Sequence, residues 1–307
     1  MKVVLLAGGV GGAKMAEGFD GLEGVELSVI GNVADDAAFH GLWVSPDIDT
    51  LTYSLAGRID RAQGWGVADE GHRALKVLAE LGSETWMTLG DRDFGLHIYR
   101  SHMLAQGQSR SEIAAHVAKA FGVKSRILLP TDDVVQTRVQ VAAGWLSFQE
   151  YFVRARCAPE VMALDYAGID AAQPTGAALA AIAGADLIVL APSNPLVSIE
   201  PILSVPQIRE AVAGAAAPVL AVSPLIAGKV VKGPADRMMK AMGLRANALG
   251  VAEYYAGLVD HMIIDHADAG LAAEIMALGM GCTTLPTLLT SRAEKEALAA
   301  SIIRVAG

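Results

Sequence analysis

The 307-residue sequence has little that would tie it to a membrane or to an oxidising compartment. Its two cysteines, Cys157 and Cys282, are far apart and match no metal-binding spacing. No apolar run approaches the roughly 18 residues that a membrane-spanning helix needs. The opening Met1–Ala7 resembles the start of a signal peptide, but the glycines that follow end the apolar run, so we interpret it as a buried strand. We therefore expect a cytoplasmic protein with no membrane partner.

The sequence also lacks a basic block and any pair of histidines at ligand spacing. It has 24 Lys and Arg against 33 Asp and Glu, for a net charge of −9. Nucleic acids are therefore excluded as partners, because affinity for a phosphate backbone depends on clustered cations. We take the histidines as structural, with His97 the only one near the site proposed below: His40, His72, His97, His102, His116, His261 and His266.

What the sequence does have is an alternation of apolar runs and helical patterns. A strand at Lys2–Ala7, a helix at Ala13–Leu22 and a strand at Val25–Gly31 form a βαβ opening, which predicts a parallel sheet covered by helices. Continuous apolar runs predict further strands that are buried on both faces, at Asp186–Pro192, Pro218–Ser223 and His261–Asp265. We predict an α/β fold with a Rossmann-like core and a mostly parallel sheet.

The middle of the chain has a different pattern. Helices are predicted at Asp69–Leu81 and Arg92–Ala105, and a capping box of Ser109 and Glu112 opens a third that runs to about Gly122. An antiparallel pair, Val135–Val141 and Trp145–Val153, turns near Gly144. We predict a single α/β unit over residues 1–307, with a mainly helical subdomain that carries a β-hairpin inserted at approximately residues 50–165.

A glycine-rich turn, Gly8-Gly9-Val10-Gly11-Gly12, follows the first strand and opens the first helix. Glycines let the backbone approach a ligand closely, and the helix N-terminus offers free N–H groups to phosphate. The turn is neither a Walker A motif nor a clean dinucleotide fingerprint. A tight turn without a ligand is the alternative, but four glycines exceed what such a turn requires. We therefore predict a phosphate contact.

Four aspartates, Asp35, Asp36, Asp47 and Asp49, follow the second strand. Carboxylates at this density repel one another unless a cation or a proton lies among them. Loops at the carboxyl ends of parallel strands bind ligands in open α/β sheets, and Mg²⁺ prefers a few carboxylates together with a phosphate. Helix capping explains Asp47 or Asp49, but it does not explain all four. The cluster predicts metal-assisted phosphate chemistry.

Further polar groups follow later strands and precede helices. Leu89–Asp93 precedes a helix that carries His97 and Arg100. The alternative to a binding role is that Asp91 caps this helix and that residues from Asp93 to Arg100 form an ordinary solvated face. Pro130–Asp133 follows a strand, and the alternative to a binding role for this segment is a simple acidic turn.

In the C-terminal half, two prolines fix a loop that aims Ser193 and Asn194. Lys229 and Lys232 lie among glycines and could neutralise a phosphate, with surface lysines in a turn as the alternative.

Taken together, these segments resemble the 2-phospho-L-lactate transferase family, which acts in making the deazaflavin coenzyme F-420. Each motif is weak alone, but the set spans nearly the whole chain in the family's order. The matching segments are Gly8–Gly12, Pro46–Thr50, Leu89–Asp93, Leu129–Asp133, Pro192–Pro195, Lys232–Pro234 and Gly250–Tyr255.

The resemblance implies a Rossmann-like core with an inserted region over the deazaflavin Fo, and transfer of a phospho-acid from a guanylylated donor to Fo with release of GMP. It implies nucleotide-binding residues at Gly8, Gly9, Gly11, Gly12, Lys14, Ser193, Asn194, Lys229, Lys232 and Gly233. It implies acceptor-binding residues at Asp49, Thr88, Asp91, Asp93, His97, Thr131 and Asp133. Thr88 stands where some members carry a lysine, and a threonine cannot supply that charge.

The implied chemistry is attack by Fo's ribityl hydroxyl on the phosphorus that bears the acid, in line with the departing GMP. Such a transfer depends mostly on positioning and charge neutralisation. We expect one Mg²⁺ held by Asp36, Asp47 or Asp49, with Asp47 and Asp49 catalytic and the general base near Asp49. The acid stays open between lactate, enolpyruvate and glycerate. A homodimer, common among large apolar α/β enzymes, also stays open.

Two rival functions share the glycine-rich core. One is a non-catalytic relative that binds nucleotide sugars, but the Pro46–Thr50 and Leu89–Asp93 segments favour the transferase. The other is a nucleotide-dependent oxidoreductase. It is disfavoured because the second strand ends in Gly31-Asn32 and lacks the acidic residue of the dinucleotide fingerprint.

Overall fold

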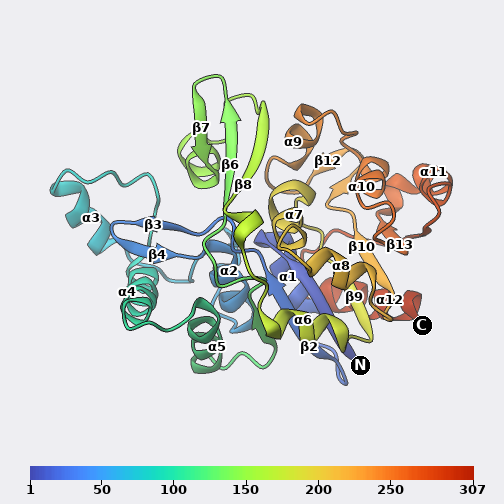
Figure 1. Ribbon diagram of the computed structural model, residues 1–307, viewed down its shortest axis with the longest axis horizontal. Coiled ribbons are helices and arrows are strands. Elements are labelled where there is room, and N and C mark those ends of the chain that lie inside the picture. Colours follow the sequence, from blue (N-terminus) through green and yellow to red (C-terminus); the bar gives the residue numbers. More distant parts are fainter.

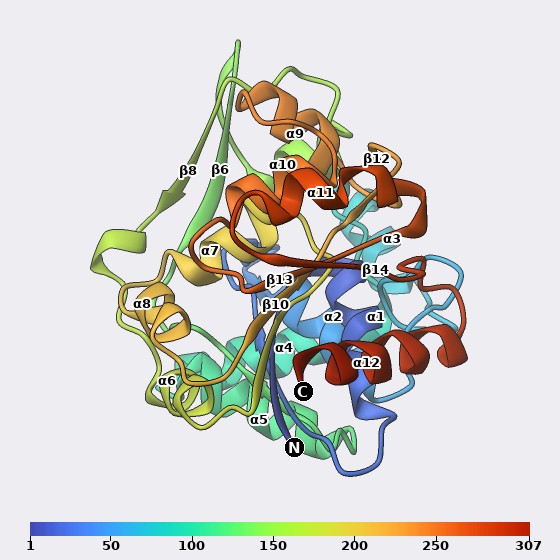
Figure 2. The same ribbon diagram turned by 90° about the vertical axis from the view of Figure 1, so that its right-hand side faces the viewer.

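A seven-stranded, fully parallel sheet forms the centre of the computed structural model, which describes residues 1–307 (Figures 1 and 2). The strand order is β14-β13-β10-β9-β1-β2-β5. The bounds are β1 (Lys2–Ala7), β2 (Glu26–Gly31), β5 (Arg126–Leu128), β9 (Leu187–Leu190), β10 (Val219–Val222), β13 (His261–Ile264) and β14 (Gly281–Thr284). The predicted α/β class with a mostly parallel sheet is confirmed, and the predicted strands fall within one or two residues of the observed ends.

Side chains of alternate residues along β1 enter two different cores, because successive side chains of a strand point to opposite faces. Val3 and Leu5 join one core, and Val4 and Leu6 join the other. All four are at most 2% exposed, and full burial of such a side chain contributes about 1.5–3 kcal/mol. Burial on both faces is why these strands read as uninterrupted apolar runs.

Helices cover both faces of the sheet. One core packs against α1 (Gly9–Asp20), α2 (Pro46–Leu55), α5 (Arg110–Ala120) and α12 (Arg292–Ala306). The other packs against α6 (Gly176–Ala183), α7 (Glu200–Leu203), α8 (Ile208–Ala213), α9 (Ala235–Ala241), α10 (Ala248–Tyr254) and α11 (Ala272–Met276). Helix α1 begins at Gly9 rather than at the predicted Ala13, so most of the glycine-rich turn is its first turn. None of the helices combines the length and apolar composition that crossing a membrane requires.

The middle of the chain contains the predicted helices. They are α3 (Arg73–Glu80), α4 (Asp91–Ala105) and α5, and a small hairpin of β3 (Ala37–Phe39) and β4 (Leu42–Val44) precedes them. The capping box is confirmed, because the Ser109 hydroxyl accepts the N–H of Glu112 and the Glu112 carboxylate accepts the N–H of Ser109. The insertion at approximately residues 50–165 stays a prediction as a unit, and one strand within this range, β5, lies in the central sheet.

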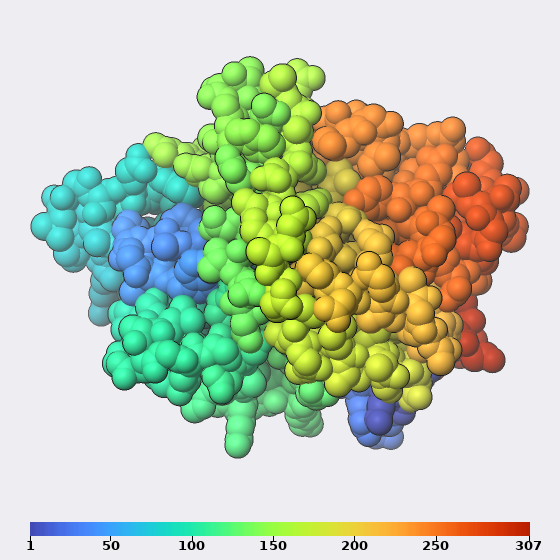
Figure 3. All heavy atoms as spheres, viewed as in Figure 1, coloured from blue at the N-terminus to red at the C-terminus, as the bar shows by residue number.

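A three-stranded antiparallel sheet projects from the body of the molecule (Figures 1 and 3). It consists of β6 (Gln136–Val141), β7 (Gly144–Ser147) and β8 (Ala163–Ala167). The predicted strand Trp145–Val153 is wrong beyond Ser147, because Glu150–Arg154 forms a π-helix, η1. The reason is local: the carboxylate of Glu150 accepts the N–H of Ser147, and the hydroxyl of Ser147 accepts the N–H of Glu150.

Short elements fill the loops at the carboxyl ends of β9, β10 and β13. They are η3 (Pro195–Ile199), the two-stranded ribbon of β11 (Leu225–Ile226) and β12 (Lys229–Val230), and η4 (His266–Leu271), while η2 (Ile169–Ala171) precedes α6. All of these except η2 lie at the edge of the sheet where open α/β folds bind ligands.

Candidate functional site

The glycine-rich turn lies where the chain changes direction across the sheet. From β1 the chain runs to β2 on one side and later returns to β9 on the other, which makes the gap between β1 and β9 a topological switch point. A Cβ added to Gly11 would lie 2.1 Å from the carbonyl oxygen of Pro192. The Ser193 hydroxyl donates to the carbonyl oxygen of Gly8 at 2.7 Å. The glycines therefore bring the loops after β1 and β9 into direct contact.

Two lysines lie beside this turn. The pKa of Lys14 is lowered by burial and then by the nearby Lys295, and the pKa of Lys232 is lowered by burial and then by Lys14. Lys232 donates to the carbonyl oxygen of Gln63, and a Cβ on the next residue, Gly64, would be 3.1 Å from Val10 of the turn. An anion bound between these ammonium groups would relieve their repulsion.

The other predicted nucleotide-binding residues lie around this turn and along the β12 segment. Asn194 accepts the N–H of Leu196 and so caps η3. Lys229 is exposed on β12, and Gly233 has a φ of +90° that favours glycine.

A pair of buried carboxylates, Asp35 and Asp47, lies next to the turn without a cation. A Cβ on Gly8 would lie 2.7 Å from Oδ2 of Asp47, which accepts Nδ2 of Asn32 at 3.0 Å. Burial raises the pKa of Asp47 to about 6, and burial followed by the charge of Asp47 raises the pKa of Asp35 well above its ordinary value. Oδ1 of Asp35 has no hydrogen-bond partner. Two buried carboxylates repel each other, so a cation or a proton would stabilise this pair.

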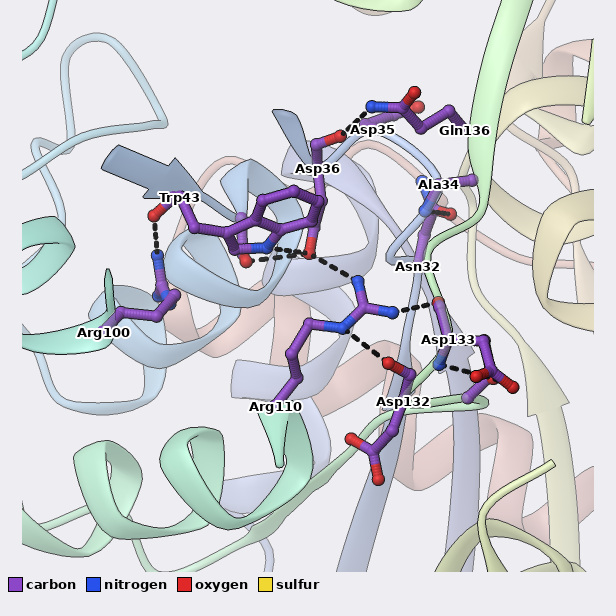
Figure 4. Close-up of polar contacts among 12 residues, drawn as sticks. Asn32, Ala34, Asp35, Asp36, Trp43, Arg100, Arg110, Asp132, Asp133 and Gln136 are labelled. Carbon is purple, nitrogen blue, oxygen red and sulfur yellow. Dashed lines mark hydrogen bonds and ion pairs between the residues drawn. The ribbon is translucent and has the colours of Figure 1, made fainter. Parts of the chain in front are cut away.

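The neighbouring Asp36 is already paired. Its Oδ2 accepts the Ser45 hydroxyl at 2.8 Å and Nε1 of Trp43 at 3.2 Å, and it lies 3.5 Å from the Arg110 guanidinium. Burial outweighs the effect of Arg110 and raises the pKa of Asp36 to about 7. Figure 4 shows the Arg110 side chain between Asp36 and the backbone of Asp132 and Asp133, to whose carbonyl oxygens it donates.

The sequence interpretation missed Arg110. It follows the helix N-cap, a position that predicts exposure, yet the residue is 7% exposed.

Asp49 forms a second buried ion pair. Its Oδ2 accepts NH1 of Arg100 at 3.1 Å, and its Oδ1 accepts NH2 of the same guanidinium. Nδ1 of His97 lies 3.8 Å from Asp49, but burial lowers the pKa of His97 to about 4, so this imidazole is neutral at pH 7. His97 and Arg100 are 1% and 6% exposed, so a solvated face is the wrong interpretation for both.

The remaining predicted acceptor residues fall into two groups. Asp93 is half-buried near Asp49 and accepts the Tyr53 hydroxyl at 2.8 Å, and burial raises its pKa to about 6. Asp91 caps α3 by accepting the N–H groups of Arg73 and Ala74.

The second group forms a turn or faces solvent. Thr131 is fully buried and accepts the N–H of Asp133, whose carboxylate accepts the N–H of Gln173 at 2.7 Å. Thr88 is exposed. The cap considered above is wrong for the helix it named, because Gly90 is the N-cap of α4 and Asp91 instead accepts N–H groups of α3. The acidic turn accounts for the observed contacts of Thr131 and Asp133. Contact of all three residues with the acceptor stays a prediction.

The donors available to a metal differ from the set that the sequence predicted. No group of three or more His, Cys, Asp or Glu side chains is arranged to hold a metal ion. Asp36 and Asp49 each have an arginine partner, whereas Asp35 and Asp47 have none. Two carboxylates fit Mg²⁺, which completes its shell with phosphate oxygens and water. The magnesium itself stays a prediction, and the best-fitting donors are Asp35 and Asp47.

Comparisons with known proteins identify the family and the fold of the chain. Residues 3–277 match the family model described as 2-phospho-L-lactate transferase CofD. The chain is 43% identical to a phosphoenolpyruvate transferase of Kitasatospora aureofaciens, with 94% of this chain and 93% of the relative covered. It is 35% identical to a 2-phospho-L-lactate transferase of Methanosarcina acetivorans, with 98% of each covered. A solved structure of a UPF0052-family protein from Bacillus halodurans has the same fold, with a TM-score of 0.65 at 17% identity over 98% of each chain.

Proposed function

The chain belongs to the 2-phospho-L-lactate transferase family, and we propose that it transfers a phospho-acid group from a GDP-linked donor to the ribityl hydroxyl of the deazaflavin Fo, releasing GMP, in coenzyme F-420 biosynthesis. The observation that carries the proposal is the pairing of two complementary features at one switch point. The glycine turn with Lys14 and Lys232 suits a diphosphate, and the Asp35–Asp47 pair suits a divalent cation beside it.

On the donor side, the N-terminus of α1 supplies N–H groups to the diphosphate, and the two lysines neutralise its charge. The Ser193 hydroxyl, already bonded to Gly8, fixes the loop that encloses it. Asp35 and Asp47 would hold Mg²⁺, which supplies charge neutralisation at the transferring phosphoryl group. Their mutual repulsion is the physical reason that a cation would bind there.

In the proposed reaction the ribityl oxygen forms a new bond to the phosphorus that bears the acid, and the phosphoanhydride bond to GMP breaks. The hydroxyl proton passes to a carboxylate, and GMP leaves with the electron pair of the broken bond. Because the transition state of such transfers is loose, a weak base in the right place suffices. We propose Asp49 for this role, held in one orientation by Arg100.

The names of the relatives favour enolpyruvate as the acid that the guanylylated donor carries. The relative at 43% identity is named a phosphoenolpyruvate transferase, and the one at 35% a 2-phospho-L-lactate transferase. Both names also favour the transferase over the alternative of a non-catalytic protein that binds nucleotide sugars. We therefore propose the enolpyruvyl donor first, ahead of the lactyl and glyceryl donors.

The test combines the purified protein with Fo, Mg²⁺ and each of three guanylylated donors, which carry lactate, enolpyruvate or glycerate. Mass spectrometry reads the products. A phosphodiester of Fo together with GMP supports the transfer, and the donor with the highest kcat/KM identifies the acid. No product from any donor, together with no binding of Fo, would overturn the proposal.

A further inference from the structure

A cavity of about 530 Å³ lies outside the residues assigned so far. It opens beyond the carboxyl ends of β10 and β13. Its wall comes from the turn of the β11–β12 ribbon, from the N-cap of α10 and from η4: Ala227, Gly228, Asn247, Ala267, Asp268, Gly270 and Leu271. Apart from the backbone, its polar groups are the side chains of Asn247 and Asp268.

In each of these two side chains, one polar atom has a hydrogen-bond partner in the protein and the other has none. Asp268 is 6% exposed, and its Oδ2 accepts the N–H of Ala227 at 2.9 Å, while Oδ1 has no protein partner and no lysine or arginine pairs with it. Asn247 uses Oδ1 to accept the N–H of Gly250 at 2.9 Å, which leaves the two donors of Nδ2 free. The cavity wall therefore presents one anionic acceptor and one amide donor.

We propose that Asp268 and Asn247 select guanine as the base of the bound nucleotide. Guanine has two N–H donors, at N1 and the 2-amino group, beside the acceptor O6. A carboxylate and an amide donor match this edge, whereas adenine offers an acceptor at N1 and a donor at N6. The inference rests on the proposed function for the presence of a nucleotide, and it adds the residues that read the base.

The position of the cavity suits this role. The sheet order places β9 and β10 between β1 and β13, so about three strand spacings, or roughly 14 Å, separate the glycine turn from the loop after β13. The ribbon that lines the cavity at Gly228 also leads directly to Lys232 beside the glycine turn. The ribose and diphosphate of one extended nucleotide are long enough to bridge a span of this order.

The structural role of Asp268 uses only one of its two carboxylate oxygens. Fixing the N–H of Ala227 takes a single acceptor oxygen, which an asparagine also provides. The second oxygen is surplus to the fold, and the buried charge costs free energy unless a donor reaches it.

The test is isothermal titration calorimetry of the full chain with guanosine, xanthosine and adenosine diphosphates. The wild-type protein should prefer the guanosine form. Asp268→Asn keeps an acceptor for Ala227 but puts a donor where guanine also has one. This variant should bind the guanosine form about 10- to 100-fold more weakly, as loss of a hydrogen bond to a charged acceptor implies, and the xanthosine form more tightly than wild type does.

Two further variants separate base recognition from local damage. Asn247→Asp retains the cap on Gly250 but places a carboxylate against O6, so affinity for the guanosine form should fall. Asp265→Asn changes a carboxylate that caps the same η4 segment without lining the cavity, and the base preference should stay that of wild type.

The titrations distinguish failure of the base site from failure of the proposed transfer. If Asp268→Asn binds the three diphosphates with the wild-type order of affinities, the base lies elsewhere, and the inference is overturned while the proposed transfer stands. If the wild-type protein binds none of the three diphosphates, the guanylylated donor of the proposed function fails, and the base site fails with it.

Discussion

At the scale of single residues, identical side chains in one cluster have different environments. Asp36 and Asp49 lie against Arg110 and Arg100, while Asp35 and Asp47 lie only against neutral or acidic groups. Removing one partner of a buried ion pair leaves an uncompensated charge, so the arginines fix the first two carboxylates in place. The other two keep their capacity for a cation.

Asp49→Asn should lower kcat by about 100-fold or more, because the amide cannot accept the hydroxyl proton. Binding of Fo should change far less. Steady-state kinetics and a fluorescence titration of Fo measure the two effects. Asp170→Asn, an exposed residue of η2, is the control and should behave as wild type. Unchanged turnover in Asp49→Asn would remove Asp49 from the reaction.

Asp47→Asn should abolish most of the rise in melting temperature that Mg²⁺ gives the wild-type protein, because one of two carboxylate ligands is lost. Differential scanning fluorimetry with and without Mg²⁺ measures this shift, and Ca²⁺ serves as a comparison ion. An equal Mg²⁺ shift in the variant and in the wild type would place the ion elsewhere.

At the scale of elements, the site depends on close approach between loops. The turn after β1 can contact the loop after β9 only because Gly11 and Gly12 lack side chains. The helix capping of α5 and the Ser147–Glu150 turn show the opposite case, where local hydrogen bonds alone fix the element. The first kind of feature needs tertiary contacts, and the second does not.

Gly11→Ala should destabilise the protein by about 1–3 kcal/mol and weaken nucleotide binding, because its Cβ would overlap the carbonyl oxygen of Pro192. Gly95→Ala is the matched control. It lies on an exposed position of α4 with no atom within 4 Å of the added Cβ, so it should stabilise by up to about 1 kcal/mol. Urea unfolding measures both changes. Equal stability of the two variants would show that the loops can separate freely.

At the scale of the whole molecule, the buried carboxylates make stability depend on pH. The pKa of Asp35 is raised well above its ordinary value, and those of Asp36, Asp47 and Asp93 are raised to about 7, 6 and 6. Between pH 4 and 7 the native state therefore binds protons that the unfolded chain has already released. Stability from these groups falls as the pH rises through this window. His97, with its pKa lowered to about 4, and His261, whose pKa burial lowers, act in the opposite direction, but they are two groups against four.

The free energy of unfolding should therefore be higher at pH 5 than at pH 8, and Mg²⁺ should narrow the difference by neutralising Asp35 and Asp47. Urea denaturation at the two pH values, with and without Mg²⁺, measures this. Asp93→Asn removes one raised carboxyl and should flatten the dependence. A stability that rises from pH 5 to pH 8 without Mg²⁺ would contradict the raised pKa values of these four carboxyl groups.

The sequence by itself determined the parallel α/β core, the glycine turn, the capped helix α5 and the order of motifs that marks the family. These follow from short-range rules, such as apolar runs in buried strands, glycine conformations and caps three residues apart. Only the tertiary structure decided which aspartates are free, because Arg100 pairs with Asp49 from 51 residues away. It also decided that Gly228, Asn247 and Asp268 share one cavity wall. Charge pairing and cavity shape depend on distances in space, which the local sequence pattern does not encode.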